Sequence, residues 1–442
     1  MLQRKKTEIE KIMRSHLCNR CGTCVGLSEG KVVFGNREHE YRPRIVKPLN
    51  EKEAELLSKA CAGHDFNFPD FNNLIFSQAP HYHRFIGSYR RLAIGHANDP
   101  FIRGNGASGG ILSAVLIFLL EKKRIDGVVT TRMSPTQPWL TEPFIATTRE
   151  EILESAQSKY IITSVNEILP QIAAFQGKLA YVGLPGQVQS IRKLQSMRHP
   201  SVKNIEYIFG PFYGNTLHFS SINSFLHAHG EKDHRRIRKL YFRYGEWPGR
   251  MRVELDNGKV MELPKFHANY LIPFHILKNS LLCTDLTNEF TDLSGGDAWA
   301  PVYEERGKGF SMIVVRSEAA DALVNEMINE GWLTIWPIEE EEAIRMHSHG
   351  YDLKKRGTFI RMRFRKWLGL PNPDYGYELK GFPVARYLME IVISSLFIVL
   401  GTAPARFIAD RIPMRWMGAL FETARTRWKK ATHSIKRTQL EA

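Results

Sequence analysis

Apolar helical stretches and short apolar strands alternate through the middle of the chain. Residues 111–124 (ILSAVLIFLLEKKR) are strongly apolar and follow Ser108-Gly109-Gly110, which predicts a buried helix. Residues 127–131 and 178–182 are short apolar runs beside glycine-containing turns, and they predict buried strands. Because such alternation is typical of layered folds, we expect a protein of the α/β (α+β) class.

The pattern changes on both sides of this region. Residues 1–80 are rich in loops and contain four of the five cysteines, whereas the chain from Lys354 onward is basic and helical. Between them we expect helices from Thr148 and from Gln187, a β-rich segment at 240–275 with a hairpin at Asn257-Gly258, a strand at 311–316 and a helix from Ser317 to about Gly331. We therefore predict three parts, residues 1–84, 85–350 and 351–442.

A second apolar segment lies near the C-terminus. Residues 387–405 contain one charged residue, Glu390, and are followed by apolar and Trp residues interleaved with arginines. A spanning helix needs about 20 apolar residues, so a true span is borderline here. Peripheral association with an anionic membrane, packing on the protein's own body and packing on a partner are the other interpretations.

Composition and charge narrow the choice of partner. The 442 residues have ordinary globular composition, which argues against disorder, collagen-like repeats and a polytopic membrane protein. Lys and Arg exceed Asp and Glu by 61 to 46, and residues 351–442 alone carry 18 against 7. The tail has no recognised nucleic-acid module, so we expect no nucleic acid and regard lipid headgroups as the anionic partner.

The cysteines indicate a metal centre. Cys18, Cys21 and Cys24 form a CxxCxxC run, and Cys61 is the expected fourth ligand. This single continuous run favours an iron–sulfur cluster over zinc, with free thiols as the remaining alternative. An odd, sparse count does not suit a disulfide scaffold, and the charged first residues show no secretory signal. We therefore expect a cytoplasmic protein.

Four short motifs could bind a ligand. Ser108-Gly109-Gly110 at a helix start suits an anion, although a plain helix cap is the alternative. Ser158-Lys159-Tyr160 offers a cation, a hydroxyl and an aromatic ring, or else a solvated helix end. Residues 183–187 (GLPGQ) and 292–299 (DLSGGDAW) are expected to be loops that line a site, or structural turns.

Taken in order, these segments resemble one family, the beta subunit of coenzyme F-420 hydrogenase/dehydrogenase. Its relatives include hydroxymethyl-chlorophyll reductase and a ferredoxin-dependent vinyl reductase of chlorophyll synthesis. The resemblance covers roughly residues 15–335 and is carried by CNRCGTC, NGASGGILSAVL, IDGVVTT with QSKYIITS, KLAYVGLPGQVQSIRKL, FRYGEWPGRMRVELDNG, and LLCTDLTNEFTDLSGGDAW with GFSMIVVRS. It implies a ferredoxin-like N-terminal region, an α/β flavin-binding domain, FAD and one or two 4Fe–4S clusters.

The sequence departs from the family pattern at several cysteines. Gly186 stands where members carry the Cys of GLPCQ, and Tyr213 stands where they carry the Cys of FCG. Members also carry a CxxC pair, of which Ser280 replaces the first Cys and Cys283 remains. The N-terminal run also lacks its usual Cys-Pro, because Leu27 and Ser28 stand there. Gly and Tyr cannot replace thiolate ligands. We therefore predict that the inner cluster is absent and that one cluster remains, on Cys18, Cys21, Cys24 and Cys61.

These inferences predict a flavin-dependent oxidoreductase that links a 4Fe–4S cluster, FAD, a small-molecule substrate and an electron carrier such as ferredoxin. The resemblance implies that FAD is held by Ser108, Gly109, Gly110, Ser158, Lys159 and Tyr160, and that its ring faces Gly183, Pro185, Gln187, Gly296 and Asp297. The alternative is a non-catalytic accessory protein of surface-polysaccharide synthesis, which the missing cysteines favour. The sequence identifies no proton donor.

Overall fold

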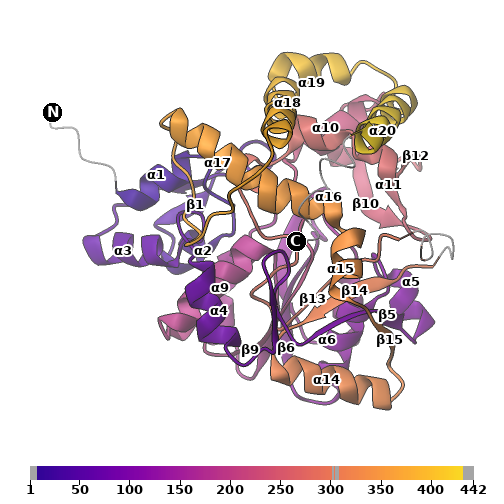
Figure 1. Cartoon of the computed structure of the whole chain (residues 1–442). Coiled ribbons are helices and arrows are strands. Elements are labelled where there is room, and N and C mark those ends of the chain that lie inside the picture. Colours follow the sequence, from indigo (N-terminus) through magenta and orange to yellow (C-terminus); the bar gives the residue numbers. More distant parts are fainter. Residues whose placement is uncertain (1–6, 301–302, 304–307, 432–442) are drawn as a thin grey trace.

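An eight-stranded mixed sheet forms the centre of the molecule (Figure 1). The computed structural model describes residues 7–300, 303 and 308–431. The strands lie in the order β15 (Leu333–Pro337), β5 (Arg91–Ala97), β14 (Ser311–Val315), β13 (Leu293–Asp297), β9 (Ile205–Pro211), β8 (Leu179–Val182), β6 (Gly127–Met133) and β7 (Thr141–Ala146). The four strands β13, β9, β8 and β6 are parallel, and their neighbours on either side pair antiparallel.

Helices cover both faces of this sheet because successive strand residues point to opposite sides. In β14, Ile313 and Val315 pack into one core while Met312 and Val314 pack into another. The first core contains α5 (Pro100–Asn105), α6 (Ile111–Glu121), α7 (Arg149–Glu154) and α14 (Glu318–Asn329). On the other face lie α4 (Phe68–Phe76), α8 (Leu169–Ala174) and α9 (Pro185–Ser196). The prediction of an α/β protein is confirmed.

The predicted elements are found with small shifts at their ends. The strands expected at 127–131, 178–182 and 311–316 are β6, β8 and β14, and the helix expected from Gln187 begins at Pro185. The prediction of a loop at 292–299 is wrong, because Leu293–Asp297 forms strand β13 inside the large sheet. Its glycines suit this place because a Cβ on Gly296 would lie 2.4 Å from the Phe212 ring.

A smaller sheet forms a second core beside the first. It consists of β10 (Ile237–Tyr244), β11 (Arg250–Leu255) and β12 (Val260–Pro264), and the predicted hairpin at Asn257-Gly258 joins its last two strands. Helices α10 (Ser220–His227), α11 (Lys265–Ala268) and α12 (Leu271–His275) complete this core. Residues 265–275 thereby become a wall between the two cores.

The cysteine-bearing region packs against the large sheet's helices. It contains α1 (Glu8–Arg14), α2 (Thr23–Leu27), α3 (Glu51–Ala60) and the short pair β1 (Val32–Phe34) and β2 (Pro43–Ile45). A second short pair, β3 (His81–His83) and β4 (Gly87–Tyr89), leads into β5. Helix α2 contacts η1 (Val165–Ile168) and α8, and α3 contacts α9.

The C-terminal part begins as a succession of helical segments that follow one another closely. It runs through α15 (Glu340–Met346), α16 (Ser348–Tyr351), the π-helical segment η5 (Asp352–Gly357) and α17 (Thr358–Trp367), followed by α18 (Val384–Leu400), α19 (Ala403–Ala409) and α20 (Met414–Ala431). Five of its basic side chains are buried: Lys354, Lys355, Arg356, Arg361 and Arg386. Much of this basic region is therefore part of the folded body, and packing crosses the predicted boundary at residue 351.

Candidate functional site

A cavity of about 440 Å³ lies at the carboxyl ends of the parallel strands. In open α/β sheets this is the usual place for a ligand. Its sheet side is formed by Thr130, Thr131, Val182, Pro211, Gly295, Gly296 and Asp297. The opposite wall comes from β10, β11, α11 and α12, through Phe242, Met251, Lys265, Ala268, Leu271 and Ile272. The volume is within the range of small-molecule and cofactor sites.

The start of α6 points into this cavity. Gly110 is its first flanking residue and has φ +74°, and a Cβ there would lie 2.8 Å from the carbonyl oxygen of Ile102. Ile111, Leu112 and Ser113 line the cavity, so the amide end of an 11-residue helix faces it. That end carries partial positive charge and unpaired N–H groups, which favour an anionic ligand.

Of the three residues before α6, Ser108 and Gly110 line the cavity and Gly109 does not. The Gly109 N–H donates to Ser311 Oγ at 2.9 Å. A Cβ on Gly109 would lie 2.4 Å from the carbonyl oxygen of Gly95. The glycine is therefore required by close packing of the loop against β5 and β14.

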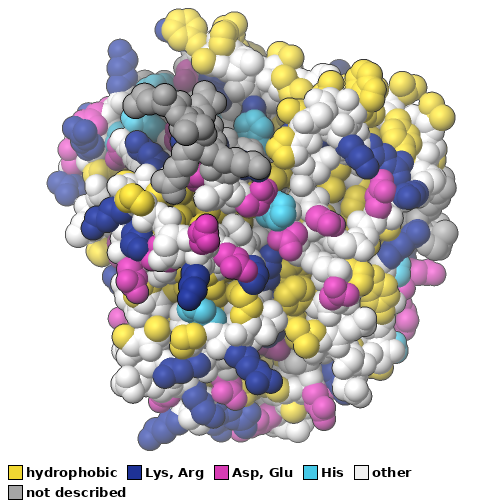
Figure 2. All heavy atoms as spheres, turned by 90° about the vertical axis from the view of Figure 1, so that its left-hand side faces the viewer, with side chains coloured by type: hydrophobic (Ala, Val, Ile, Leu, Met, Phe, Trp, Pro, Cys, Tyr) yellow, Lys and Arg dark blue, Asp and Glu magenta, His cyan; other side chains and the backbone are white. Residues whose placement is uncertain are grey.

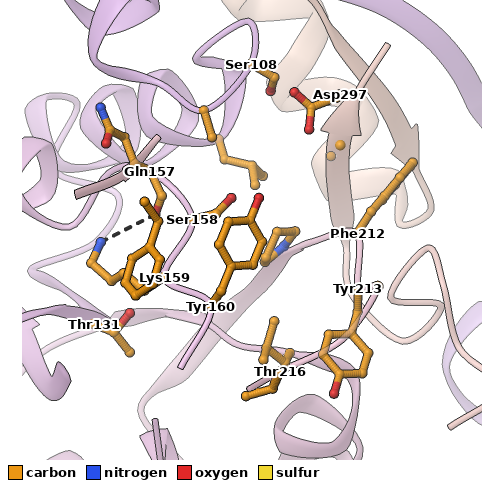
Figure 3. Close-up of a pocket in the computed structure, with 18 of the residues that line it drawn as sticks. Ser108, Thr131, Gln157, Ser158, Lys159, Tyr160, Phe212, Tyr213, Thr216 and Asp297 are labelled. Carbon is orange, nitrogen blue, oxygen red and sulfur yellow. Dashed lines mark hydrogen bonds between the residues drawn. The ribbon is translucent and has the colours of Figure 1, made fainter. Parts of the chain in front are cut away.

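Lys159 lines the cavity, but its charge is directed at the backbone (Figure 3). Its Nζ donates to the carbonyl oxygens of Ser155 and Ala156 at 2.7 and 2.8 Å, just after the end of α7. Burial lowers the pKa of Lys159 to about 7. Lys159 thus caps a helix end. Ser158 and Tyr160 on either side also line the cavity.

Tyr160 belongs to a polar network in the cavity wall. Arg243 donates through NH1 to Tyr160 Oη at 3.2 Å and through NH2 to Asp297 Oδ1 at 2.9 Å. Trp247 Nε1 donates to the same carboxylate at 2.6 Å. Figure 3 shows the Tyr160 hydroxyl directed toward the side of the cavity where Ser108 and Asp297 lie. Tyr160 Oη therefore accepts a hydrogen bond from Arg243. Among the described residues, none accepts a hydrogen bond from the Tyr160 hydroxyl.

The charges around this network shift two pKa values. Burial opposes ionisation of Tyr160, but Lys265 and Arg243 outweigh it and lower the pKa of the phenol. Burial likewise opposes ionisation of Asp297, yet Arg243 holds the pKa of the carboxyl below its ordinary value. Asp297 is thus ionised and anchors Arg243. Tyr160 is a phenol that is more acidic than an ordinary tyrosine.

Two lining residues were not identified from the sequence. Lys265 lies over the rings of Tyr160, Phe266 and Trp299 and forms no ion pair with any described residue, so its charge remains available. His347 also lines the cavity, edge-on to Phe212, and burial lowers its pKa to about 4. Neither residue belongs to a recognisable motif, and His347 comes from beyond the segment that carries the resemblance.

Only some residues of the turn at 183–187 line the cavity. Gly183 and Gln187 line it, and Gln187 Nε2 donates to the Thr163 carbonyl oxygen at 2.7 Å. Pro185 is the first residue of α9 and lies outside the lining. In all, nine of the eleven predicted cofactor residues line this one cavity, Gly109 and Pro185 being the exceptions.

The four predicted metal ligands line a second, much smaller cavity of about 20 Å³. Cys18, Cys21, Cys24 and Cys61 all contribute to it, together with Ile9, Ile12, Met13 and Leu57. Burial, together with the neighbouring thiols Cys21 and Cys18, raises the pKa of Cys61 to about 12. Burial also raises the pKa values of Cys21 and Cys24. Such thiols ionise when a bound metal stabilises the thiolate.

The donor set consists of four thiols that line one cavity. No group of three or more His, Cys, Asp or Glu in the described chain is close enough to hold one metal ion. In a cluster each thiolate binds a different iron, so the sulfurs stand farther apart around a shared centre. Thiols are the ligand type that such a cluster uses.

One short segment connects the wall of the large cavity to the cysteine loop. Thr163 and Val165 line the large cavity, while the Asn166 N–H donates to the Cys21 carbonyl oxygen at 2.9 Å. Gly22 makes this approach possible, because a Cβ there would lie 2.6 Å from the Glu167 nitrogen. The cysteine loop is thus fastened directly to the back of the cavity wall.

Two of the positions where the family carries a cysteine, Gly186 and Tyr213, lie beside the remaining Cys283. Gly186, Tyr213 and Cys283 line a third cavity of about 30 Å³ together with Asn19. Tyr213 Oη and Ser280 Oγ are hydrogen-bonded at 2.6 Å, so two of the replacing residues satisfy each other. A Cβ on Gly186 would lie 2.2 Å from Asn19 Nδ2. Amide, phenol and hydroxyl groups thus surround the single thiol, Cys283, at this place.

Comparisons with known proteins agree with this geometry. Residues 93–170 match the family described as "Coenzyme F420 hydrogenase/dehydrogenase, beta subunit N-term", and residues 176–341 match its C-terminal counterpart. The chain is 26% identical over 310 residues to the coenzyme F420 hydrogenase subunit beta of Methanococcus voltae, covering 65% of this chain and 99% of that protein.

Two further relatives have related descriptions. The coenzyme F420-dependent sulfite reductase of Methanocaldococcus jannaschii is 23% identical over 364 residues, which is 79% of this chain and 52% of that protein. This chain thus spans about half of the reductase. A chain of the F420-reducing [NiFe] hydrogenase complex of Methanosarcina barkeri superposes with a TM-score of 0.53 at 20% identity, covering 67% of this chain and 99% of that one. This likeness shows a shared fold.

Proposed function

Because the chain belongs to the coenzyme F420 hydrogenase/dehydrogenase beta-subunit family, we propose that it is a flavin-dependent oxidoreductase. It passes electrons between one 4Fe–4S cluster, FAD and a small-molecule substrate. The relatives are named as a reductase and as hydrogenase subunits, which supports the oxidoreductase class. An electron carrier such as ferredoxin is the proposed redox partner, and we propose no role for nucleic acid.

One juxtaposition carries this proposal. Nine predicted flavin-side residues line one cavity, and four cysteines line another. Residues 163–166 link the two, because Thr163 and Val165 line the large cavity and the Asn166 N–H donates to the Cys21 carbonyl oxygen. Cys18, Cys21, Cys24 and Cys61 would hold the cluster. When bound, the cluster supplies single electrons and FAD exchanges them for two-electron chemistry.

The residues of the chain have separate roles in this scheme. The amide end of α6 and Lys265 bind the anionic groups of the ligand. Asp297 stays ionised and orients Arg243, which in turn orients Tyr160. Tyr160 Oη holds the proton that is delivered to the substrate, because Arg243 occupies its acceptor side and leaves the O–H free.

An absorbance spectrum of the anaerobically purified full-length protein tests the cofactors. We expect flavin bands together with a broad shoulder near about 400 nm from thiolate–iron centres. Cys24→Ser should lose iron and keep flavin, whereas Cys283→Ser, the matched control, should keep both. A colourless, iron-free and fully folded protein would contradict the proposal.

The proton role needs its own measurement. Tyr160→Phe should retain flavin and lower kcat with an artificial electron donor by roughly 100-fold, because general acid catalysis is worth about that much. An unchanged kcat would remove Tyr160 from the mechanism and leave the cofactor proposal intact.

The accessory role in surface-polysaccharide synthesis is the second candidate. It is favoured by the replaced family cysteines: Tyr213 and Ser280 hydrogen-bond to each other, and Tyr213 and Gly186 line the third cavity. The same spectrum separates the two candidates, because an accessory protein needs neither flavin nor iron.

A further inference from the structure

Helix α18 buries its charged side chains and exposes its apolar ones. Arg386 and Glu390 are 0% exposed, whereas Leu388 is 60% and Ile398 is 66% exposed. The outward face consists of Val384, Leu388, Ile391, Val392, Leu396, Ile398 and Val399. A helix on a water-facing surface has the opposite distribution. Its exposed side is therefore suited to an apolar environment.

The buried charges set the rotation of α18 about its axis. Glu390 accepts from Arg361 NH1 at 2.6 Å and from Arg386 NH1 at 2.9 Å. Arg386 Nε also donates to Asp352 Oδ1 at 2.8 Å. Rotating α18 to hide its apolar side would break these pairs in a buried setting, which is costly. The exposure of the apolar side is thus built into the fold.

The next two helices extend this apolar surface. Phe407 and Ile408 of α19 and Trp416 and Leu420 of α20 are each about 60% exposed or more. Figure 2 shows hydrophobic side chains gathered along the upper edge of the molecule, at the height of α18–α20 in Figure 1, with Lys and Arg beside them. We call the exposed apolar residues of these three helices the apolar face. Contiguous surfaces of this kind mark interaction sites.

Basic residues outnumber acidic ones in the helices that carry the apolar face. Residues 384–431 contain eight Lys or Arg and three Asp or Glu. Each of the three carboxylates is paired: Glu390 as described, Asp410 with His227 and Glu422 with Arg425. Arg411, Arg427 and Lys430 are exposed cations. The surroundings therefore attract an anionic surface.

We propose that the apolar face docks onto an anionic lipid bilayer, with α18, α19 and α20 lying in the headgroup region. Apolar and Trp side chains would enter the acyl boundary while Arg and Lys meet the phosphates. No single described helix is long and apolar enough to cross a membrane, and α18 and α19, which together have the length and composition, are bent by 77°. This shape suits a surface position.

The helices that carry the apolar face pack against the wall of the large cavity. Helix α18 contacts α12, and α20 contacts α11, the two helices whose Lys265, Ala268, Leu271 and Ile272 line the cavity. The proposal itself rests on exposure and charge alone. It therefore stands or falls independently of flavin and iron.

Flotation of purified full-length protein with lipid vesicles tests the proposal. We expect binding to phosphatidylcholine vesicles that contain phosphatidylglycerol, weaker binding to pure phosphatidylcholine, and loss of the difference at high salt. The double variant Ile398→Asp/Phe407→Asp should lower the bound fraction at least about tenfold. Leu74→Asp/Phe101→Asp is the matched control, because both residues are about 65% exposed outside the apolar face.

Two further measurements keep the outcomes distinct. Circular dichroism melting should show that both double variants are folded, since each changes exposed side chains. Wild-type protein that stays unbound to anionic vesicles at low salt would overturn the proposal. Light scattering measures the oligomeric state and so tests whether a second copy of the chain occupies the face. A wild-type dimer that Ile398→Asp/Phe407→Asp converts to a monomer would assign the apolar face to that second copy.

Discussion

Helices α6 and α18 have similar compositions and opposite surroundings. Seven of the eleven residues of α6 are buried, all of them apolar, in the core formed with the large sheet, α7 and α14. Helix α18 has seventeen residues, of which three are buried, and two of these are Arg386 and Glu390. One helix is held by hydrophobic packing, and the other is held by ion pairs.

This contrast shows what apolar sequence does and does not determine. Both segments form helices, because neither has a glycine or proline in its interior. Residues far away in the chain decide which side of each helix is buried. The β-strands and α14 pack around α6, whereas Asp352 and Arg361 form ion pairs with the buried side of α18. Four predictions test this distinction.

The largest effect is expected from Glu390→Ala on the buried side of α18. It leaves Arg361 without its carboxylate and Arg386 with Asp352 alone, and breaking a buried pair in this way costs about 3–5 kcal/mol of unfolding free energy. Denaturant unfolding measures it. In the control, Glu422→Ala removes a partly exposed pair with Arg425 and should cost less than about 1 kcal/mol. Equal costs would refute the idea that ion pairs hold α18.

A matched truncation compares the two helices directly. Ile117→Ala removes a fully buried side chain of α6 and should cost about 3 kcal/mol. Ile398→Ala removes a side chain of α18 that is 66% exposed and should change the stability in water by less than about 0.5 kcal/mol. A large loss for Ile398→Ala would mean that the apolar face is already covered.

The start of α6 should be sensitive to a single methyl group. Gly110→Ala places a Cβ at φ +74° and 2.8 Å from the Ile102 carbonyl oxygen, which should cost about 1–2 kcal/mol. Gly104→Ala in α5 meets no atom within 4 Å and should be neutral or slightly stabilising. Thermal melting of the two variants checks this difference.

The smallest effect is a pH dependence in α12, the helix against which α18 packs. Burial, with Arg406 and His218 nearby, lowers the pKa of His275 to about 3. Below pH 6.5 the unfolded chain takes up a proton that the folded protein does not, so stability falls as pH drops from 6.5 toward 3. Between pH 7 and 5.5 this amounts to about 1 kcal/mol.

Comparing His275→Gln with wild type at both pH values isolates that contribution. The variant should lose about 1 kcal/mol less than wild type over this interval. His81→Gln changes an exposed histidine and should follow the wild-type curve. An unchanged slope in His275→Gln would show that His275 does not titrate as described.

Local patterns were enough to predict much of the fold. β6, β8, β14 and α6 were found because each is a run of apolar residues with turn residues at its ends. β13 was missed because its glycines and Asp297 look like a turn, and only its neighbours β9 and β14 make it a strand. The gathering of nine predicted residues around one cavity followed from motifs that stand at strand ends and helix starts.

Sequence alone determined the α/β class and the family, because these depend on local periodicity and on short motifs. Tertiary structure decided what each side chain meets. It turned Lys159 toward carbonyl oxygens, brought Arg243 and Lys265 to Tyr160, and buried Arg386 and Glu390 so that α18 exposes its apolar side. Burial and pairing join residues far apart in the chain, and no local pattern carries that information.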